Sequence, residues 1–146
     1  MTGEPTYAGD RTSAEAWEVL ASDERAILID VRTRAEWTFV GTADLQGIGK
    51  AAALIEWQRF PGMDVNAHFV DEVGEALRER GASPDTPVFF LCRSGARSRS
   101  AAIAITSAGL RAAYNISDGF EGPQDADRHR GGVAGWKAAG LPWAQS

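Results

Sequence analysis

The feature that most constrains the fold is the alternation of short apolar runs with stretches of helical periodicity. Apolar runs at 26–29 and 87–91, and a third short run at 113–116, are too short to be helices. Segments with helical patterns stand before and between them. Because such runs form strands that are buried on both faces of a sheet, their order predicts an α/β domain with a mostly parallel sheet. In sheets of this kind, ligands bind at the carboxyl ends of the strands.

Four helices are expected, at 13–20, 33–39, 66–81 and about 98–107. Ser13 and Thr33 are expected to cap the first two helices, and Asn66 is the expected N-cap of the third. Gly81 and Gly109 are expected to end the third and fourth helices, since glycine adopts the left-handed conformation that stops a helix.

The connecting segments are less regular. Residues 41–63 are predicted to be mostly loop with a short strand or turn, and residues 121–130 form a polar segment. With 146 residues, 44% of them hydrophobic, the chain has the size and apolar content of one ordinary globular domain. We therefore expect a single domain over residues 1–146, with its core between about residues 13 and 142.

Charge is unevenly distributed along the chain. The formal net charge is -5, which argues against a nucleic-acid or anionic-membrane partner, because those partners require a broad basic face. Residues 86–117 nevertheless contain no Asp or Glu. The arginines of that stretch are Arg93, Arg97, Arg99 and Arg111. An acidic protein thus keeps one cationic region.

The single cysteine of the chain, Cys92, lies in that region. It follows the run at 87–91 and opens the glycine-containing segment 92–98, which leads into the fourth helix. Amide donors of such a loop and of a helix's first turn form a pocket for negative charge. A thiol held there ionises more readily, and cysteine reacts as the thiolate. The alternative is a buried cysteine that serves as a small hydrophobe, but the flanking residues favour a reactive one.

One cysteine excludes an internal disulfide and an internal resolving thiol, so any sulfur chemistry must end on another molecule. Residues 1–11 lack a basic stretch followed by an apolar core, and no stretch reaches the length of a membrane span. We expect a soluble, cytoplasmic protein.

Four features together resemble the rhodanese family of sulfurtransferases. They are the run 28–32 followed by Glu36, the loop 92–98, the pair Asp118-Gly119, and the segment 131–142. Their order and spacing make the resemblance specific. It implies an α/β/α layered fold with a parallel sheet of about five strands. It also implies that Cys92 accepts sulfane sulfur from thiosulfate or a related donor as a persulfide, and passes it to cyanide or a thiol, protein thiols included.

The resemblance implies roles for further residues. The loop that would bind the substrate consists of Arg93, Ser94, Gly95, Ala96, Arg97 and Ser98. Arginine suits the oxygens of an anionic donor through forked donation. Asp30, Arg32 and Glu36 are expected to support the structure. Asp30 and Arg32 would tie the following turn together, and Arg32 is close enough in sequence to pair with Glu36. No metal and no cofactor are expected.

One stretch departs from the family pattern. Many rhodanese domains have Gly-His-Ile-Pro-Gly-Ala where this chain has residues 40–45, without the histidine and the proline. The resemblance therefore leaves open the shape of the wall that this segment contributes to the site, and with it the identity of the substrate. Residues 49–66 and 121–130 are candidates to rebuild it. Trp57 and Phe60 could form a lid, although aromatic side chains more often belong to a core.

Two other functions are consistent with the sequence. A cysteine-dependent phosphatase or arsenate reductase requires an arginine six positions after the cysteine, where this chain has Ser98. Some rhodanese-like domains act instead as non-catalytic binding or sensor modules, but these usually lose the cysteine. We therefore favour the sulfurtransferase.

Overall fold

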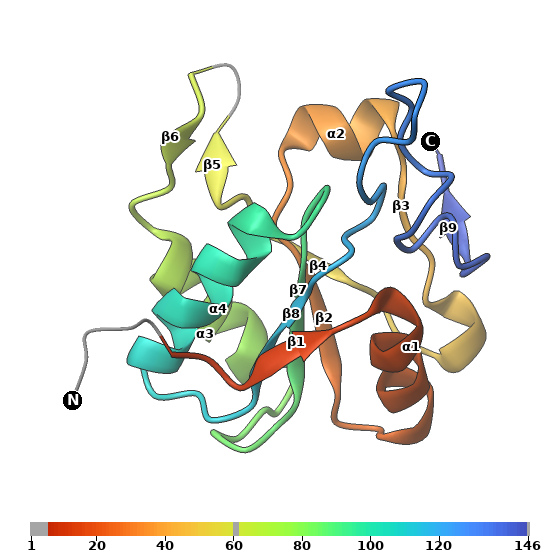
Figure 1. Ribbon diagram of the computed structural model, residues 1–146. Coiled ribbons are helices and arrows are strands. Elements are labelled where there is room, and N and C mark those ends of the chain that lie inside the picture. The colour runs from red at the N-terminus through yellow and green to blue at the C-terminus, as the bar shows by residue number, and fades with distance from the viewer. Residues whose placement is uncertain (1–5, 60–61, 146) are drawn as a thin grey trace.

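The computed structural model describes residues 6–59 and 62–145, and its centre is a parallel sheet of five strands (Figure 1). The strands lie in the order β1-β8-β7-β2-β4, and each neighbouring pair is parallel. Their bounds are Gly9–Arg11 for β1, Ala113–Ile116 for β8, Val88–Leu91 for β7, Ile27–Asp30 for β2 and Ala53–Leu54 for β4. The predicted α/β class with a mostly parallel sheet is confirmed.

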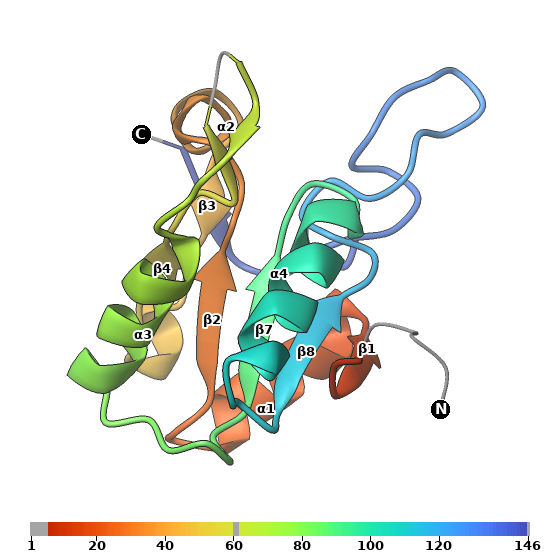
Figure 2. The same ribbon diagram turned by 90° about the vertical axis from the view of Figure 1, so that its left-hand side faces the viewer.

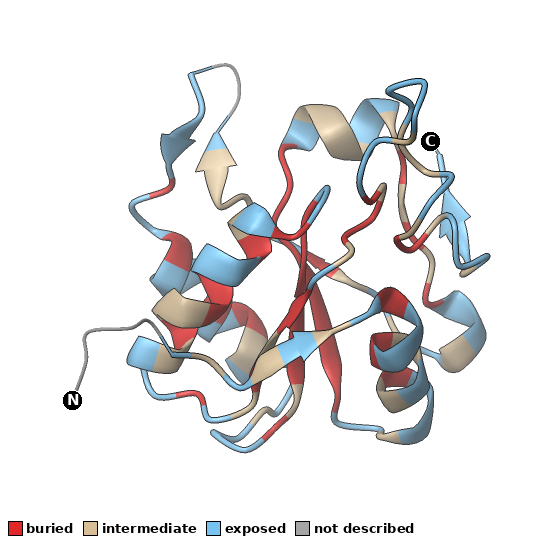
Figure 3. Cartoon of the chain, in the orientation of Figure 1, coloured by how far each residue is buried: buried red, intermediate tan, exposed pale blue. Residues whose placement is uncertain are grey.

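The central strands β2 and β7 are buried on both faces, as their unbroken apolar runs require (Figure 3). Their register pairs Ile27 with Val88 and Asp30 with Leu91. The strands therefore end level with each other. The chain after Asp30 and the chain after Leu91 leave the sheet at the same edge, and Cys92 lies at that edge.

Helices cover both faces of the sheet (Figure 2). Helix α1 (Ser13–Ser22) packs on one face, where Ala16 and Leu20 join a core with Leu28 of β2. Helices α3 (Phe69–Glu79) and α4 (Ala96–Ser107) pack on the other, with Ile27 and Ile29 of the same strand. Successive residues of β2 thus point into opposite layers, because side chains along a strand alternate between its two faces. None of the helices in the described residues is long and apolar enough to cross a membrane.

Small elements complete the fold. Helix α2 (Arg34–Phe39) follows β2, and the 3-10 helix η1 spans Gln46–Ile48. The pairs β3 (Thr42–Ala43) with β9 (Trp143–Ala144) and β5 (Gln58–Arg59) with β6 (Asp64–Val65) are antiparallel. Residues 41–63, predicted to be mostly loop, therefore supply several short strands, one of which, β4, extends the main sheet. Strands β1 and β9 lie in segments where no strand was expected.

The capping predictions have mixed outcomes. Thr33 caps α2 as expected, in a capping box with Glu36. Helix α1 is capped by Thr12 rather than Ser13. The N-cap of α3 is His68, and Asn66 instead forms the turn before it, accepting a hydrogen bond from the His68 amide at 3.0 Å. Helix α4 begins at Ala96, two residues earlier than predicted, because Gly95 ends the loop there.

Candidate active site

The loop after β7 holds Cys92 at the N-terminus of α4. Cys92 is 1% exposed, and the Gly95 amide donates to its Sγ at 3.1 Å. Gly95 has a φ of 107°, and a Cβ there would lie 2.5 Å from the carbonyl oxygen of Ser117. Both the torsion and the close approach require glycine. The curl that aims an amide at the sulfur therefore depends on this one residue.

A chain of polar side chains continues from the sulfur into the sheet. Ser98 Oγ lies 3.2 Å from Cys92 Sγ and donates to Asn115 Oδ1 at 2.5 Å. The Asn115 amide in turn donates to Asp10 Oδ1 at 3.0 Å. Sequence reasoning found Ser98 but missed Asn115 and Asp10. The signal for Asn115 was present, since an amide in the middle of a buried strand requires a polar partner.

The outer side of the loop is held by the chain after β8. The amide of Phe120 donates to the Cys92 carbonyl at 2.8 Å, and that of Glu121 to the Arg93 carbonyl at 3.0 Å. A Cβ on Gly119 would lie 2.3 Å from the Arg93 carbonyl oxygen. Asp118 accepts from the Ser13 amide at 2.8 Å. Residues 118–121 thus join the cysteine loop to helix α1, through backbone hydrogen bonds on the loop side and through the Asp118 carboxylate on the helix side.

The two loop arginines have different surroundings. Arg93 is exposed, and no ion pair to it forms within the described residues, whereas Arg97 forms two hydrogen bonds with Glu36 at 2.7 and 2.9 Å. Burial raises the pKa of Glu36, but the hydrogen bonds and charge of Arg97 together with the hydrogen bonds from Thr33 outweigh burial and hold that pKa below its ordinary value. Glu36 conversely raises the pKa of Arg97 above its usual range, against the effect of burial. Glu36 therefore neutralises the second arginine of the loop.

Asp30 and Arg32 form a second pair, beneath α2. Arg32 Nη2 lies 2.7 Å from Asp30 Oδ2 and also donates to the Gly41 carbonyl at 2.7 Å. The guanidinium stacks over the Phe120 ring, 4.2 Å from its centroid. The expected pairing of Arg32 with Glu36 does not form, because each of them has a closer partner of opposite charge, Asp30 and Arg97.

A hollow of about 510 Å³ opens beside the cysteine loop. It is lined by Thr33, Ala35, Glu36, Phe39, Val40, Met63, Arg93, Arg97 and Glu121. Figure 1 shows α2, the β5–β6 hairpin and the chain after β8 gathered at this end of the sheet. Met63 belongs to the segment 49–66 and Glu121 to the segment 121–130. Both segments that were candidates to rebuild the wall therefore contribute to this hollow. Trp57 is partly buried and packs edge-on against Phe69 of the core, with ring centroids 4.9 Å apart, and Phe60 lies outside the described residues.

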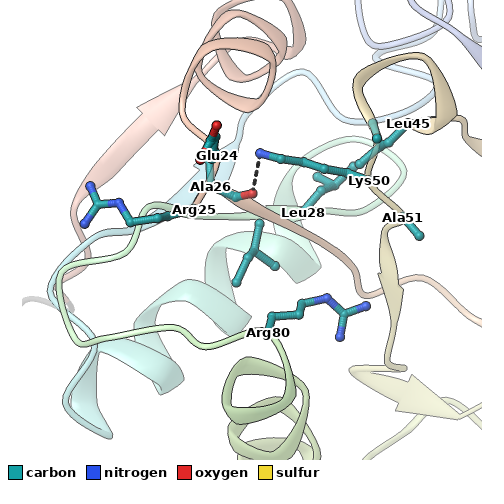
Figure 4. Close-up of a pocket in the computed structure, with 10 residues that line it drawn as sticks. Glu24, Arg25, Ala26, Leu28, Leu45, Lys50, Ala51 and Arg80 are labelled. Atoms are coloured by element: carbon teal, nitrogen blue, oxygen red, sulfur yellow. Dashed lines mark hydrogen bonds between the residues drawn. The ribbon is translucent and has the colours of Figure 1, made fainter.

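A second hollow, of about 410 Å³, lies at the start of β2 (Figure 4). Lys50 extends along it and donates to the carbonyls of Leu20, Asp23 and Ala26 at 2.8, 2.7 and 2.8 Å. Burial lowers the pKa of Lys50, but an ammonium has three donors and all three are used. This lysine ties the end of α1 to the sheet. Cys92 and the polar side chains around it lie at the opposite, carboxyl edge of the sheet.

A parallel sheet that delivers a cysteine to a curled loop at a helix N-terminus, with helices on both faces, defines the class of rhodanese-like domains. The model of the family described as the STR4 middle domain matches residues 8–146. The chain therefore belongs to this family of rhodanese-like domains.

The chain is similar to several known proteins over most of its length. Uncharacterized protein RC0915 of Rickettsia conorii is 40% identical over 131 residues, which cover 90% of this chain and 93% of that protein. The crystal structure of Rv0390 from M. tuberculosis is 48% identical, with a TM-score of 0.85 over 97% of this chain and 100% of that one. Rhodanese-like domain-containing protein 4 of Arabidopsis thaliana, chloroplastic, is 26% identical over 147 residues, which cover 99% of this chain and 28% of the plant protein.

Proposed function

We propose that the protein is a sulfurtransferase that moves sulfane sulfur from thiosulfate or a related donor to a thiophilic acceptor through a persulfide on Cys92. The observation that supports this best is the position of the sulfur. It lies at the N-terminus of a helix of 12 residues, with the Gly95 amide aimed at it. Amide donors and the helix dipole stabilise negative charge there, and both the thiolate and the persulfide are anions.

The reaction divides into two half-reactions that balance without an external oxidant or reductant. In the first, the Cys92 thiolate attacks the outer sulfur of thiosulfate. The sulfur–sulfur bond of the donor breaks, and sulfite leaves with its electron pair. In the second, cyanide or a thiolate attacks the terminal sulfur of the persulfide and the Cys92 thiolate is regenerated. Because the chain has no second cysteine, the acceptor is a separate molecule, which includes the case of a protein thiol.

The loop residues take distinct parts in this scheme. Arg93, exposed beside the hollow, attracts the anionic donor. In this scheme the amides of Ser94, Gly95, Ala96 and Arg97 hold the terminal sulfur as it arrives, and the Gly95 amide already donates to Sγ. Glu36 keeps Arg97 at the mouth of the loop. The apolar side chains of Phe39 and Met63 line the same hollow and favour donors or acceptors with an apolar portion.

Two observations favour a second candidate, a non-catalytic binding module. Cys92 is 1% exposed, so a donor reaches the sulfur only if the loop opens, and Arg97 is already paired. A module of this kind would use the hollow and the exposed ring of Phe39 to hold a partner. The two candidates differ in one measurable property, the reactivity of Cys92 towards sulfane sulfur.

The experiment is an intact-mass measurement after incubation with thiosulfate and, separately, with glutathione persulfide. A sulfurtransferase gains one sulfur atom, Cys92→Ser gains none, and cyanide or glutathione removes the added sulfur again. If neither donor gives an adduct in protein shown to be folded, the sulfurtransferase is excluded and the binding module remains. Turnover of p-nitrophenyl phosphate without an adduct would instead indicate a phosphatase.

A further inference from the structure

A hydrogen-bonded chain of side chains runs from Cys92 to the edge strand β1. Its members beyond the sulfur are Ser98, Asn115, Asp10 and Tyr7. Ser98 is 0% exposed and Asn115 is 3% exposed, whereas Asp10 is exposed. The chain thus connects a buried sulfur to a carboxylate that solvent reaches.

The direction of each hydrogen bond follows from the chemistry of its groups. An ionised carboxylate only accepts, so Asn115 must turn its NH₂ group towards Asp10. Its carbonyl oxygen then faces Ser98 and accepts the Ser98 hydroxyl at 2.5 Å. A serine hydroxyl has one hydrogen to donate. With that hydrogen used, Ser98 presents only lone pairs to Cys92, and the hydrogen between them must come from the thiol.

The two neighbours of the sulfur therefore favour opposite forms. The Gly95 amide donates to Sγ and favours the thiolate. The Ser98 oxygen accepts from Sγ and favours the protonated thiol. A carboxylate on another strand decides which way Ser98 acts, although it does not contact the cysteine.

We propose that Asp10 is a positioning residue that, through Asn115, fixes the direction of the Ser98 hydroxyl and so holds Cys92 as the thiol. Without the carboxylate, the Asn115 amide is free to turn over and donate to Ser98. Ser98 then donates its own hydrogen to the thiolate. The consequence for sulfur transfer rests on the proposed function, but the control of ionisation does not.

The other charged and titratable groups around the chain do not replace Asp10. The Tyr7 hydroxyl donates to Asp10 Oδ1 at 2.8 Å, and burial followed by this hydrogen bond raises the pKa of Tyr7, so it remains a donor. Arg99 of α4 stacks over the Tyr7 ring, and Arg11 donates to the Asp10 backbone carbonyl. On the sulfur side, the nearby charges are those of Arg97 with its partner Glu36, of the exposed Arg93 next to Cys92, and of the buried pair Asp30–Arg32.

The test is a pH titration of the thiolate's ultraviolet absorbance, taken as the difference between each protein and its Cys92→Ser counterpart. Asp10→Asn is expected to lower the midpoint by about one pH unit, since a hydrogen bond to a charged group contributes about that much. Asp10→Ala is expected to shift it in the same direction. Glu18→Gln, which removes an exposed carboxylate from α1, is the matched control and leaves the midpoint unchanged.

The decisive variant is Ser98→Ala combined with Asp10→Asn. A purely Coulombic effect of losing the Asp10 charge would survive without Ser98, whereas the hydrogen-bonded route requires that hydroxyl. The shift caused by Asp10→Asn is therefore expected to vanish in the Ser98→Ala background. A shift that persists there, or no shift with Ser98 intact, would overturn the proposal. The titration uses no sulfur donor, so its outcome is independent of whether the protein transfers sulfur.

Discussion

Two arginine–carboxylate pairs lie at the carboxyl edge of the sheet and have the same closest nitrogen–oxygen distance, but they differ in depth. In the pair Asp30–Arg32 the closest nitrogen–oxygen distance is 2.7 Å, with side chains 1% and 0% exposed. In the pair Glu36–Arg97 it is also 2.7 Å, with side chains 19% and 17% exposed. Distance alone does not distinguish the two pairs.

The two pairs differ in the parts of the molecule that they connect. Arg32 also binds the Gly41 carbonyl and stacks on Phe120, so the buried pair fastens both ends of the α2 segment to the layer beneath it. The rim pair joins α2 to α4, and both helices contribute residues to the hollow beside Cys92. Water can replace either partner at the rim but not in the interior. The inner pair therefore maintains the fold, and the outer one lines the hollow that the proposed donor would enter.

The largest effect is expected from breaking the inner pair. Arg32→Ala leaves the Asp30 carboxylate buried without its counter-ion, which typically costs about 3–5 kcal/mol. Denaturant unfolding should show this loss as a lower midpoint with an unchanged slope. A loss below about 1 kcal/mol would mean that water or a rearranged backbone satisfies Asp30, and the assignment of this pair to the fold would be wrong.

A smaller effect, in function more than in stability, is expected at the rim. Arg97→Ala should lower kcat/KM for thiosulfate about tenfold, since one charge-assisted contact is worth about 1.4 kcal/mol or more. The measurement is sulfite release at limiting thiosulfate, with cyanide as acceptor. If the variant keeps full activity, Arg97 does not act on the donor and serves only to anchor α2.

The rim pair should also appear in the pH dependence of stability. The pKa of Glu36 lies below its ordinary value of 4.5, because Arg97 and the hydrogen bonds from Thr33 together outweigh the opposing effect of burial. A lowered pKa in the folded state gives stability that is present above the unfolded value and is lost as pH falls through the folded one. The quantity to follow is the Tm of the protein minus the Tm of Glu36→Gln, a variant whose side-chain amide oxygen can still accept the hydrogen bond of the Thr33 amide at the cap. This difference should shrink below about pH 4.5. A difference that does not change with acidity would indicate that the charge of Glu36 contributes nothing.

Much of the fold follows from local patterns in the sequence. The apolar runs that become β2 and β7, the Thr33 cap and the glycine before α4 each act within a few residues, so their spacing alone indicates them. The arrangement of Cys92 at a strand end followed from the same reasoning, because parallel strands present their carboxyl ends at one edge.

The parts that could not be predicted depend on distant pairings. Glu36 and Arg97 are 61 positions apart, and only the packed structure makes them closer to each other than Glu36 is to Arg32. The link between Asn115 and Asp10 joins positions 105 apart. The short strands between residues 41 and 65 have too few residues for a periodicity to show, and their positions are set by the elements beside them.

The smallest effect is expected from a third pair, which separates geometry from depth. Arg111 Nε lies 2.7 Å from Asp85 Oδ1 and its Nη2 lies 2.9 Å from Oδ2, a fork as well formed as that of the rim pair. Both side chains are 66% exposed. Water and salt screen such a pair, so Arg111→Ala should leave Tm and thiosulfate kcat/KM within error of the parent protein. If Arg111→Ala instead costs as much as Arg97→Ala, then the quality of the fork, and not its depth or its place beside the hollow, determines what these pairs contribute.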